Sequence, residues 1–411
     1  MEKTDGGTAG NRKRLSIYIH IPFCIRKCFY CDFLSFPAEE TQKEQYVQAL
    51  LQEIREEAGR YASYTVETVF IGGGTPSVLS AGQIERIMDC LTESFSFASG
   101  EGAGDSSRLP EITIEVNPGT VTPDQLKSFR AAGINRISIG TQSVQDHELE
   151  LLGRIHRAAD FFNTYEMAEA AGFSNVNVDI MSALPGQTLE AYTDTLSKVC
   201  ALHPAHISAY SLIIEEGTYF YRLYGEGAEG RQAFPVLPTE EEEREMYEQT
   251  EAFLKNKGYH RYEISNYAKP GMECRHNTAY WRRYNYAGFG LGAASMVENV
   301  RWKNTSDMTA YLSRFLLRAE TDGGKEEIQV LSIKEQMEEF MFLGLRLTEG
   351  VSRKEFYSCF GTEMDSVYGP ILEKLCGQGL LTAEEWVRLT PYGRDISNYV
   401  MAEFLLDGKD A

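Results

Sequence analysis

The chain has 411 residues, of which 43% are hydrophobic and 24% are charged, which allows a large buried core and favours one large domain with a smaller one. Its formal net charge of −20 argues against nucleic acid and anionic membrane surfaces as partners, because both need a basic face. No segment approaches the roughly 20 continuous apolar residues of a membrane span. The polar start lacks a signal-peptide core, so residues 1–14 are expected to be a disordered tail on a cytoplasmic protein.

Short β-rich runs alternate with helical patterns through the first half of the chain. Strands are expected at 15–21, 68–71, 111–116, 135–139, 175–180 and 206–213. Helices are expected between them at 43–58, 81–95, 123–132, 158–171 and 189–202. The strand runs are apolar or nearly so, as in a parallel sheet covered on both faces. The alternation predicts an α/β fold with an open, partial (β/α)6 barrel, because these strands are too few to close a full barrel.

Breaks in this pattern indicate the domain organisation. A Gly/Ser-rich segment at 99–110 is expected to be a surface loop, and the repeated pattern ends within 224–238. A strongly acidic helix follows at 240–257, and its charges are interpreted as a solvated face. We therefore expect a core barrel at 15–235 and an extension of that core at 236–305.

The last hundred or so residues have a different character. Helices are expected at 334–345, 353–360 and 364–378, followed by a short two-stranded wing. This order predicts a helical, winged-helix-like C-terminal domain at 306–411. Such modules often bind DNA, but nothing here is basic enough for that, so a packing or lid module is favoured.

Three of the eight cysteines, Cys24, Cys28 and Cys31, lie close together directly after the first expected strand. Thiolates suit iron–sulfur clusters or zinc. A structural zinc site needs further protein ligands, and none is evident nearby, since His20 lies within an expected strand. Three thiolates on a four-iron cluster would leave one iron open to an amine and a carboxylate. The pattern favours the cluster over zinc, with a loop of reduced thiols as the least favoured alternative.

The segment from Tyr18 to Cys24, the C-x3-C-x2-C spacing and the aromatic Tyr30 together resemble the radical-SAM superfamily. The resemblance implies a [4Fe–4S] cluster on Cys24, Cys28 and Cys31, with S-adenosylmethionine (SAM) on the fourth iron. In that superfamily, an electron from the cluster cleaves the SAM sulfonium to a 5′-deoxyadenosyl radical. It also implies an electron donor such as flavodoxin or ferredoxin.

The same resemblance implies a SAM pocket along the strand ends. A glycine run after the second expected strand permits close backbone approach to a ligand, although a tight turn is the alternative explanation. Polar residues follow the later strands in order, each of which would alone be explained as a capping or loop residue. The residues implied to bind SAM are Tyr18, Tyr30, Gly73, Gly74, Thr75, Glu115, Gln142, Arg154 and Asp179.

Within the superfamily, the chain resembles the anaerobic coproporphyrinogen III oxidase group and, most closely, its haem-chaperone branch. Phe33 stands where the oxidase has a further cysteine, and the chain offers fewer residues before the first strand than the oxidase does. His276, Asn277, Tyr280 and Trp281 form an HN-x2-YW element that resembles one of the chaperone branch. It combines an imidazole suited to iron with aromatic surfaces suited to a porphyrin. The alternative is a hydrogen-bonded histidine at a domain junction, with Tyr280 and Trp281 in the core.

The resemblance implies a haem chaperone that binds haem, the cluster and SAM, with His276 as the candidate haem contact. It would deliver haem to apo-haemoproteins such as respiratory cytochromes, as a monomer or a homodimer. The alternatives are oxygen-independent coproporphyrinogen III oxidation or a radical-SAM reaction on an unrelated substrate. For the oxidase, Arg275, Arg282 and Arg283 are available to hold substrate carboxylates, although ordinary surface charge is the preferred explanation.

Overall fold

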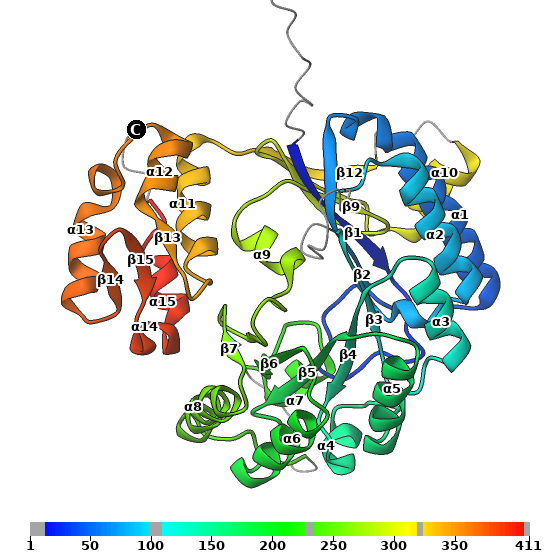
Figure 1. Ribbon diagram of the computed structural model, residues 1–411, viewed down its shortest axis with the longest axis horizontal. Helices are drawn as coiled ribbons and strands as arrows, with labels where there is room; N and C mark the ends of the chain where they lie inside the picture. The colour runs from blue at the N-terminus through cyan, green and yellow to red at the C-terminus, as the bar shows by residue number, and fades with distance from the viewer. Residues whose placement is uncertain (1–12, 99–108, 227–233, 319–323, 407–411) are drawn as a thin grey trace, which may run out of the picture.

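A large, mainly parallel sheet forms the centre of the molecule in the computed structural model (Figure 1). The structure describes residues 13–98, 109–226, 234–318 and 324–406; the tail expected at 1–14, except its last two residues, and most of the loop expected at 99–110 lie outside them. The strand order is β12-β11-β10-β9-β1-β2-β3-β4-β5-β6-β8-β7. Strands β1 to β6 pair in parallel and in chain order, which confirms the partial (β/α) barrel. Their bounds are β1 (Lys13–Ile21), β2 (Tyr64–Gly73), β3 (Glu111–Val116), β4 (Arg136–Gln142), β5 (Asn175–Ser182) and β6 (His206–Ser211).

Helices cover the outer side of this sheet (Figure 1). They begin where the sequence provides capping boxes, as at Ser80 with Gln83 and at Thr122 with Gln125. The acidic helix likewise begins at a Thr239–Glu242 box. The helices of the first 256 residues are α1 (Glu40–Glu57), α2 (Ala81–Ser94), α3 (Pro123–Ala131), α4 (Asp146–Leu151), α5 (Ala158–Ala170), α6 (Leu189–Ala201), α7 (Tyr219–Tyr224) and α8 (Glu240–Asn256), with short 3-10 turns η1 (Ala58–Tyr61) and η2 (Pro76–Val78).

The two faces of the barrel strands differ in polarity. In β3, Ile112 and Ile114 belong to the apolar core beneath the helices, whereas Glu115 lines a cavity on the concave side. In β4, Ile137 and Ile139 alternate with Ser138 and Gly140 in the same way. The expectation of apolar runs on both faces is therefore wrong. The concave face is polar because it surrounds a ligand-sized space rather than a packed core.

The sheet extends beyond the six predicted strands at both edges. Strand β9 pairs in parallel with β1, and β8 pairs antiparallel with β6. Helix α9 (Arg275–Trp281) lies on the concave side, where Glu111 accepts hydrogen bonds from the backbone N–H groups of Arg275 (3.1 Å) and His276 (3.0 Å). The added strands are β7 (His260–Arg261), β8 (Asn266–Ala268), β9 (Tyr286–Phe289), β10 (Ala294–Val297), β11 (Val300–Asn304) and β12 (Lys325–Val330).

The sheet also continues past the boundary expected at residue 306. Helix α10 (Met308–Leu317) packs on α1 through Tyr311 and Phe315, which belong to the barrel's apolar core. Strand β12 pairs with β11. The packing thus puts α10 and β12 with the barrel, beyond the boundary expected at 306.

The C-terminal elements form a separate apolar core around Phe356, Tyr368 and Phe404. Helices α11, α12 and α13 confirm the three predicted helices. The predicted two-stranded wing is a three-stranded sheet in the order β13-β15-β14. The bounds are α11 (Ile333–Gly344), β13 (Val351–Ser352), α12 (Arg353–Phe360), α13 (Met364–Gly377), β14 (Leu381–Ala383), β15 (Trp386–Leu389), α14 (Pro391–Asp395) and α15 (Ser397–Ala402).

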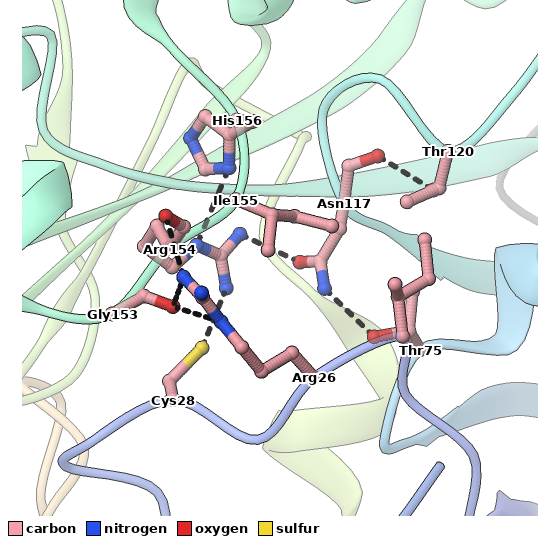
Figure 2. Close-up of a pocket in the computed structure, with 10 residues that line it drawn as sticks. Arg26, Cys28, Thr75, Asn117, Thr120, Gly153, Arg154, Ile155 and His156 are labelled. Carbon is pink, nitrogen blue, oxygen red and sulfur yellow. Dashed lines mark hydrogen bonds between the residues drawn. The ribbon is translucent and has the colours of Figure 1, made fainter.

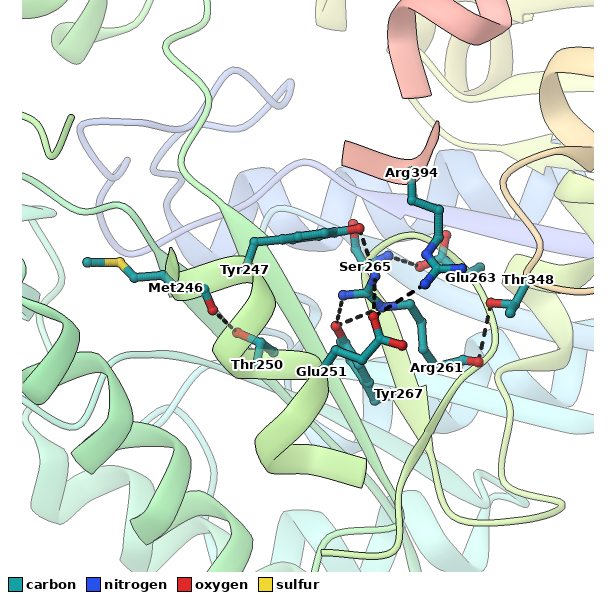
Figure 3. A network of polar contacts seen from close by, with 10 residues as sticks. All are labelled: Met246, Tyr247, Thr250, Glu251, Arg261, Glu263, Ser265, Tyr267, Thr348 and Arg394. Carbon is teal, nitrogen blue, oxygen red and sulfur yellow. Dashed lines mark hydrogen bonds and ion pairs between the residues drawn. The ribbon is translucent and has the colours of Figure 1, made fainter. Parts of the chain in front are cut away.

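A buried arginine joins this C-terminal module to the barrel (Figure 3). Arg261 of β7 donates to the hydroxyl groups of Tyr247 and Tyr267, each at 2.8 Å, and pairs with Glu251 at 3.2 Å. Glu251 in turn pairs with Arg394 of α14 at 3.4 Å. One charge network therefore spans α8, the sheet edge and the C-terminal module. Across the described ranges, no helix is both long and apolar enough to cross a bilayer.

Candidate cofactor site

The three clustered cysteines lie on the loop that follows β1, at the carboxyl edge of the sheet. Cys24, Cys28 and Cys31 are partly exposed and line one cavity of about 440 Å³. The loop is fixed to the next strand connection, since the N–H of Gly74 donates to the carbonyl of Ile21 at 2.8 Å. The thiols thus face the cavity from a loop that the sheet holds in place.

A donor set of three thiols suits a cluster better than a single ion. Among the described residues, no group of at least three His, Cys, Asp or Glu side chains is arranged to hold one metal ion. A four-iron cluster is wider than one ion, and each cysteine binds a different iron, so its ligands surround it instead of meeting at a point. The donor set of three thiolates beside an open cavity fits that requirement, whereas zinc would need four converging ligands.

The glycine run between β2 and η2 is required by close packing. Gly73 has φ +111°, and a Cβ there would lie 2.5 Å from the ring of His20. A Cβ on Gly74 would lie 2.6 Å from the carbonyl oxygen of Phe23. Only glycine lets this turn approach the cysteine loop so closely. Both glycines also line the cavity, so the tight turn and the ligand-facing surface are the same structure.

Nearly all of the residues predicted to bind SAM meet in the cysteine-lined cavity. They come from the ends of separate strands and from the loop after α4 (Asp146–Leu151). The one exception is Tyr18, which lies in an adjoining cavity of about 410 Å³ and donates or accepts a 3.0 Å hydrogen bond with His20. The residues that share the cavity with the cysteines are Tyr30, Gly73, Gly74, Thr75, Glu115, Gln142, Arg154 and Asp179.

Two buried carboxyl groups give the cavity an acidic floor. Burial, and then repulsion from Asp179, raise the pKa of Glu115 to about 8. Burial also raises the pKa of Asp179, against hydrogen bonds from Asn177 and Ser138 that lower it. Glu115 accepts the backbone N–H of Gly73 at 3.0 Å. A cationic ligand would relieve the repulsion between these carboxylates.

Arg154 provides a buried cation in the lining of the same cavity, and Figure 2 shows its contacts. Its guanidinium donates to Asn117 Oδ1 at 2.8 Å and to Cys28 Sγ at 3.6 Å. Asn117 donates in turn to Thr75 Oγ1 at 2.7 Å. The chain of contacts links the cysteine loop to the glycine run through one arginine, and an arginine stays charged even when buried.

His276 does not line either cavity. It is 1% exposed, and its two ring nitrogens form hydrogen bonds with Thr68 Oγ1 at 2.8 Å and with the hydroxyl of Tyr280 at 3.1 Å. Burial lowers the pKa of His276 to about 3, so the imidazole is neutral near pH 7. Tyr280, one helical turn later, lines the 410 Å³ cavity.

Several residues of the site were not predicted. Asn117 follows Glu115 by two positions, and its role depends on contacts with Arg154 and Thr75 that are distant in sequence. Tyr210 and Ile213 line the cysteine-lined cavity (the cofactor cavity below) from the end of β6. Their only sequence signal is their position at the end of a barrel strand. Ile213 is 67% exposed, which gives the mouth of the cavity an apolar rim.

The comparison with known families matches both parts of the chain. Residues 18–199 match the Radical SAM superfamily, and residues 331–396 match the HemN C-terminal domain. A solved structure with a similar fold is coproporphyrinogen III oxidase (HemN) from Escherichia coli, described as a radical SAM enzyme. It has a TM-score of 0.80 at 24% identity and covers 96% of this chain and 90% of its own. At that identity, the likeness concerns the fold alone.

Similar curated proteins span almost the whole chain. The heme chaperone HemW of Bacillus subtilis (strain 168) is 38% identical over 391 residues, covering 95% of this chain and 99% of the relative. The heme chaperone HemW of Escherichia coli (strain K12) is 35% identical over 406 residues, covering 96% and 98%. A mitochondrial protein of Danio rerio, radical S-adenosyl methionine domain-containing protein 1, is 28% identical over 405 residues, covering 95% and 87%.

Proposed function

Because the chain belongs to the radical-SAM superfamily, in the family of the haem chaperones HemW, we propose that it binds haem and delivers it to apo-haemoproteins such as respiratory cytochromes. The observation that carries this proposal is the full-length similarity to two curated HemW proteins from distant bacteria. The aromatic cavity beside the cofactor cavity supports it, since a porphyrin needs a broad apolar surface.

In this proposal, Cys24, Cys28 and Cys31 hold a [4Fe–4S] cluster, which when bound supplies the electron for SAM cleavage. Arg154 provides the positive charge for the carboxylate of SAM. Glu115 provides a carboxylate for its ammonium group or ribose. These roles agree with the charges of the cavity walls, which are cationic at Arg154 and acidic at Glu115.

The remaining residues proposed for SAM serve mainly through shape. Gly73 and Gly74 present the backbone of the turn to the ligand, as their lack of side chains allows, and Thr75 lines the same cavity. Tyr30 and Gln142 complete the wall next to the cysteines, with Asp179 at the floor. Tyr18 approaches from the adjoining cavity and would contact SAM only at its edge.

The cellular setting is proposed in the same way. We expect a cytoplasmic protein, a flavodoxin or ferredoxin as electron donor, and either a monomer or a homodimer as the working form. The rim of the cysteine-lined cavity is open, which suits approach of a small electron-transfer protein to the cluster.

Two parallel assays on anaerobically reconstituted protein test the function. One titrates haemin and follows the Soret band; the other supplies coproporphyrinogen III, SAM and a reductant, and measures decarboxylated product by chromatography. Saturable haem binding, followed by transfer to an apo-cytochrome and without turnover, is the expected result. Turnover without tight haem binding would instead make the protein a coproporphyrinogen oxidase.

A further inference from the structure

The HN-x2-YW element lies on α9, where two of its residues share one face. His276 and Tyr280 are separated by one helical turn, so their side chains lie one above the other. Their ring centroids are 4.9 Å apart at 88°. His276 points into the protein and Tyr280 lies at the wall of the 410 Å³ cavity. The pair therefore has an inner and an outer member.

His276 is badly placed to touch a ligand. Both ring nitrogens are already engaged, by Thr68 and by Tyr280, and Thr68 is itself only 2% exposed. The ring of Phe70 packs at 5.2 Å from the imidazole. Direct iron ligation would require His276 to break a buried hydrogen bond and to pass the ring of Tyr280.

We propose that the phenol oxygen of Tyr280 is the group of this element that binds haem iron, and that His276 is a positioning residue behind it. The inference rests on the proposed haem-binding function and assigns the contact within it. Tyrosine is an established axial ligand of ferric haem. The aromatic rings of Tyr18, Phe33 and Tyr286 line the same cavity and offer surfaces for the porphyrin.

The hydrogen bonds of His276 suit this role. With the Thr68 hydroxyl donating to Nδ1, the neutral imidazole carries its proton on Nε2 and donates it to the oxygen of Tyr280. On binding, the O–H bond of Tyr280 breaks, its oxygen bonds to the ferric iron, an iron-bound water leaves, and the phenolic proton passes to solvent. The Nε2–H group then stabilises the iron-bound phenolate without changing its own protonation.

The position of this cavity fits a porphyrin that must also come close to the cofactors. It adjoins the 440 Å³ cofactor cavity, and Phe33, Gly73 and Glu115 contribute to the walls of both. Phe33 is 61% exposed at their junction, which leaves an apolar edge facing solvent. A flat, largely apolar ligand is thus expected to bind on the Phe33 side, with SAM on the Arg154 side.

Haemin binding to the reconstituted full-length protein tests the assignment. Tyr280→Phe keeps the ring and removes the oxygen, while Tyr392→Phe removes an exposed hydroxyl on α14 as a matched control away from both cavities. We expect Tyr280→Phe to abolish the phenolate-to-iron bands in resonance Raman spectra and to raise the haemin Kd by about tenfold or more. Tyr392→Phe should keep the bands and bind within about twofold of the wild type.

A second pair of variants separates ligation from positioning. His276→Gln and Thr68→Val should keep the phenolate bands but shift them and weaken binding severalfold, with cluster content and far-UV circular dichroism unchanged. The inference is overturned if Tyr280→Phe keeps the wild-type spectrum, or if His276→Gln alone removes iron ligation. If the wild type itself binds no haemin, the proposed function and this inference are both overturned, whereas a haemin-binding wild type whose spectrum is unchanged in Tyr280→Phe overturns the inference alone.

Discussion

Glu115 and Asp179 are two buried acids in one cavity, and their repulsion gives a pH-dependent prediction. The pKa of Glu115 is raised to about 8 by burial and by Asp179. Below that pH, Glu115 is protonated in the empty cavity, and ionising it for a cationic ligand costs binding free energy. We therefore expect SAM affinity to increase as pH rises through 8. Glu115→Gln should bind SAM about tenfold more weakly at pH 9 and show a flat profile.

Calorimetric titration of the reconstituted protein with SAM between pH 6.5 and 9 measures this effect. Glu150→Gln, an exposed change on α4, is the matched control and should follow the wild type. An unchanged pH profile in Glu115→Gln would mean that another group governs the binding.

The three cysteines proposed to hold the cluster allow a simpler prediction. Replacing Cys24, Cys28 or Cys31 singly by serine should remove most of the iron and the visible absorbance of the reconstituted protein, because a cluster needs all three thiolates. Cys376→Ser, in the C-terminal module, should reconstitute normally. Iron analysis and absorbance together measure the result, and retention of the cluster in all three variants would exclude these ligands.

The residues of the site were predictable where they lie close together in the sequence. They were not predictable where only the fold brings them together. The three cysteines and the glycine run are local patterns, each within one turn or loop. Asn117 contacts partners far away in the sequence, at Arg154 and Thr75. Residue type alone favours His276 as the contact with haem iron. Its burial and its two hydrogen bonds exist only in the folded chain, so the sequence could not show them.

Among the elements, strands β7 to β12 were the ones that sequence patterns failed to indicate. Strand β7 has two residues, and the side chains of β12 are mostly exposed, so neither has a hydrophobic repeat. These two segments become strands because they pair with β8 and β11, which are distant from any local pattern. The six barrel strands were found because each has a buried apolar face of several residues.

A buried carboxyl group fastens α1 to the elements beside β1. Glu53 accepts hydrogen bonds from the N–H of Gly290 (2.8 Å), the hydroxyl of Tyr311 (2.7 Å) and the amide of Asn304. Burial raises its pKa to about 7, above its value in an unfolded chain. The folded protein therefore keeps this proton longer than the unfolded one, so Glu53 makes the fold less stable as pH rises from about 4.5 to 7.

Urea unfolding of the wild type and Glu53→Gln across this range tests the contribution. The free energy of unfolding of the wild type should fall by about 2–3 kcal/mol relative to Glu53→Gln between pH 5 and 8. Glu56→Gln, on the exposed side of the same helix, should show no such difference from the wild type. If the difference in the free energy of unfolding between the wild type and Glu53→Gln stays constant between pH 5 and 8, Glu53 is not the group that titrates in this range.

At the scale of the whole molecule, two apolar cores are joined through polar contacts that include the buried Arg283–Glu339 pair and the Arg261 network. The barrel core and the C-terminal core are separate clusters. The Arg261 network (Figure 3) crosses between them, from a guanidinium that is 3% exposed to Arg394 by way of Glu251. Helix α11 also contacts α9, so the C-terminal module rests against the element that carries Tyr280. Loosening the junction should therefore affect the cavity proposed to bind haem as well as stability.

Arg261→Met is the variant that tests this junction. It keeps the apolar stem and leaves the hydroxyls of Tyr247 and Tyr267 without their donor, so we expect a loss of about 2–3 kcal/mol in the free energy of unfolding. Arg394→Gln removes only the partly exposed pair with Glu251 and should cost less than about 1 kcal/mol. Lys127→Gln, in an exposed pair on α3, should cost nothing measurable.

The order of these losses decides what holds the module in place. If Arg261→Met lowers the free energy of unfolding most and also lets a protease cut between the cores, the charge network is what holds the two cores together. If Arg261→Met unfolds like the wild type, the joint is apolar instead, and Ile264 is the residue to change next, because it packs against the C-terminal core from the barrel side. In that case Ile264→Ala should lower the free energy of unfolding by about 2 kcal/mol or more, and Arg261 would stabilise only the edge of the sheet around β7.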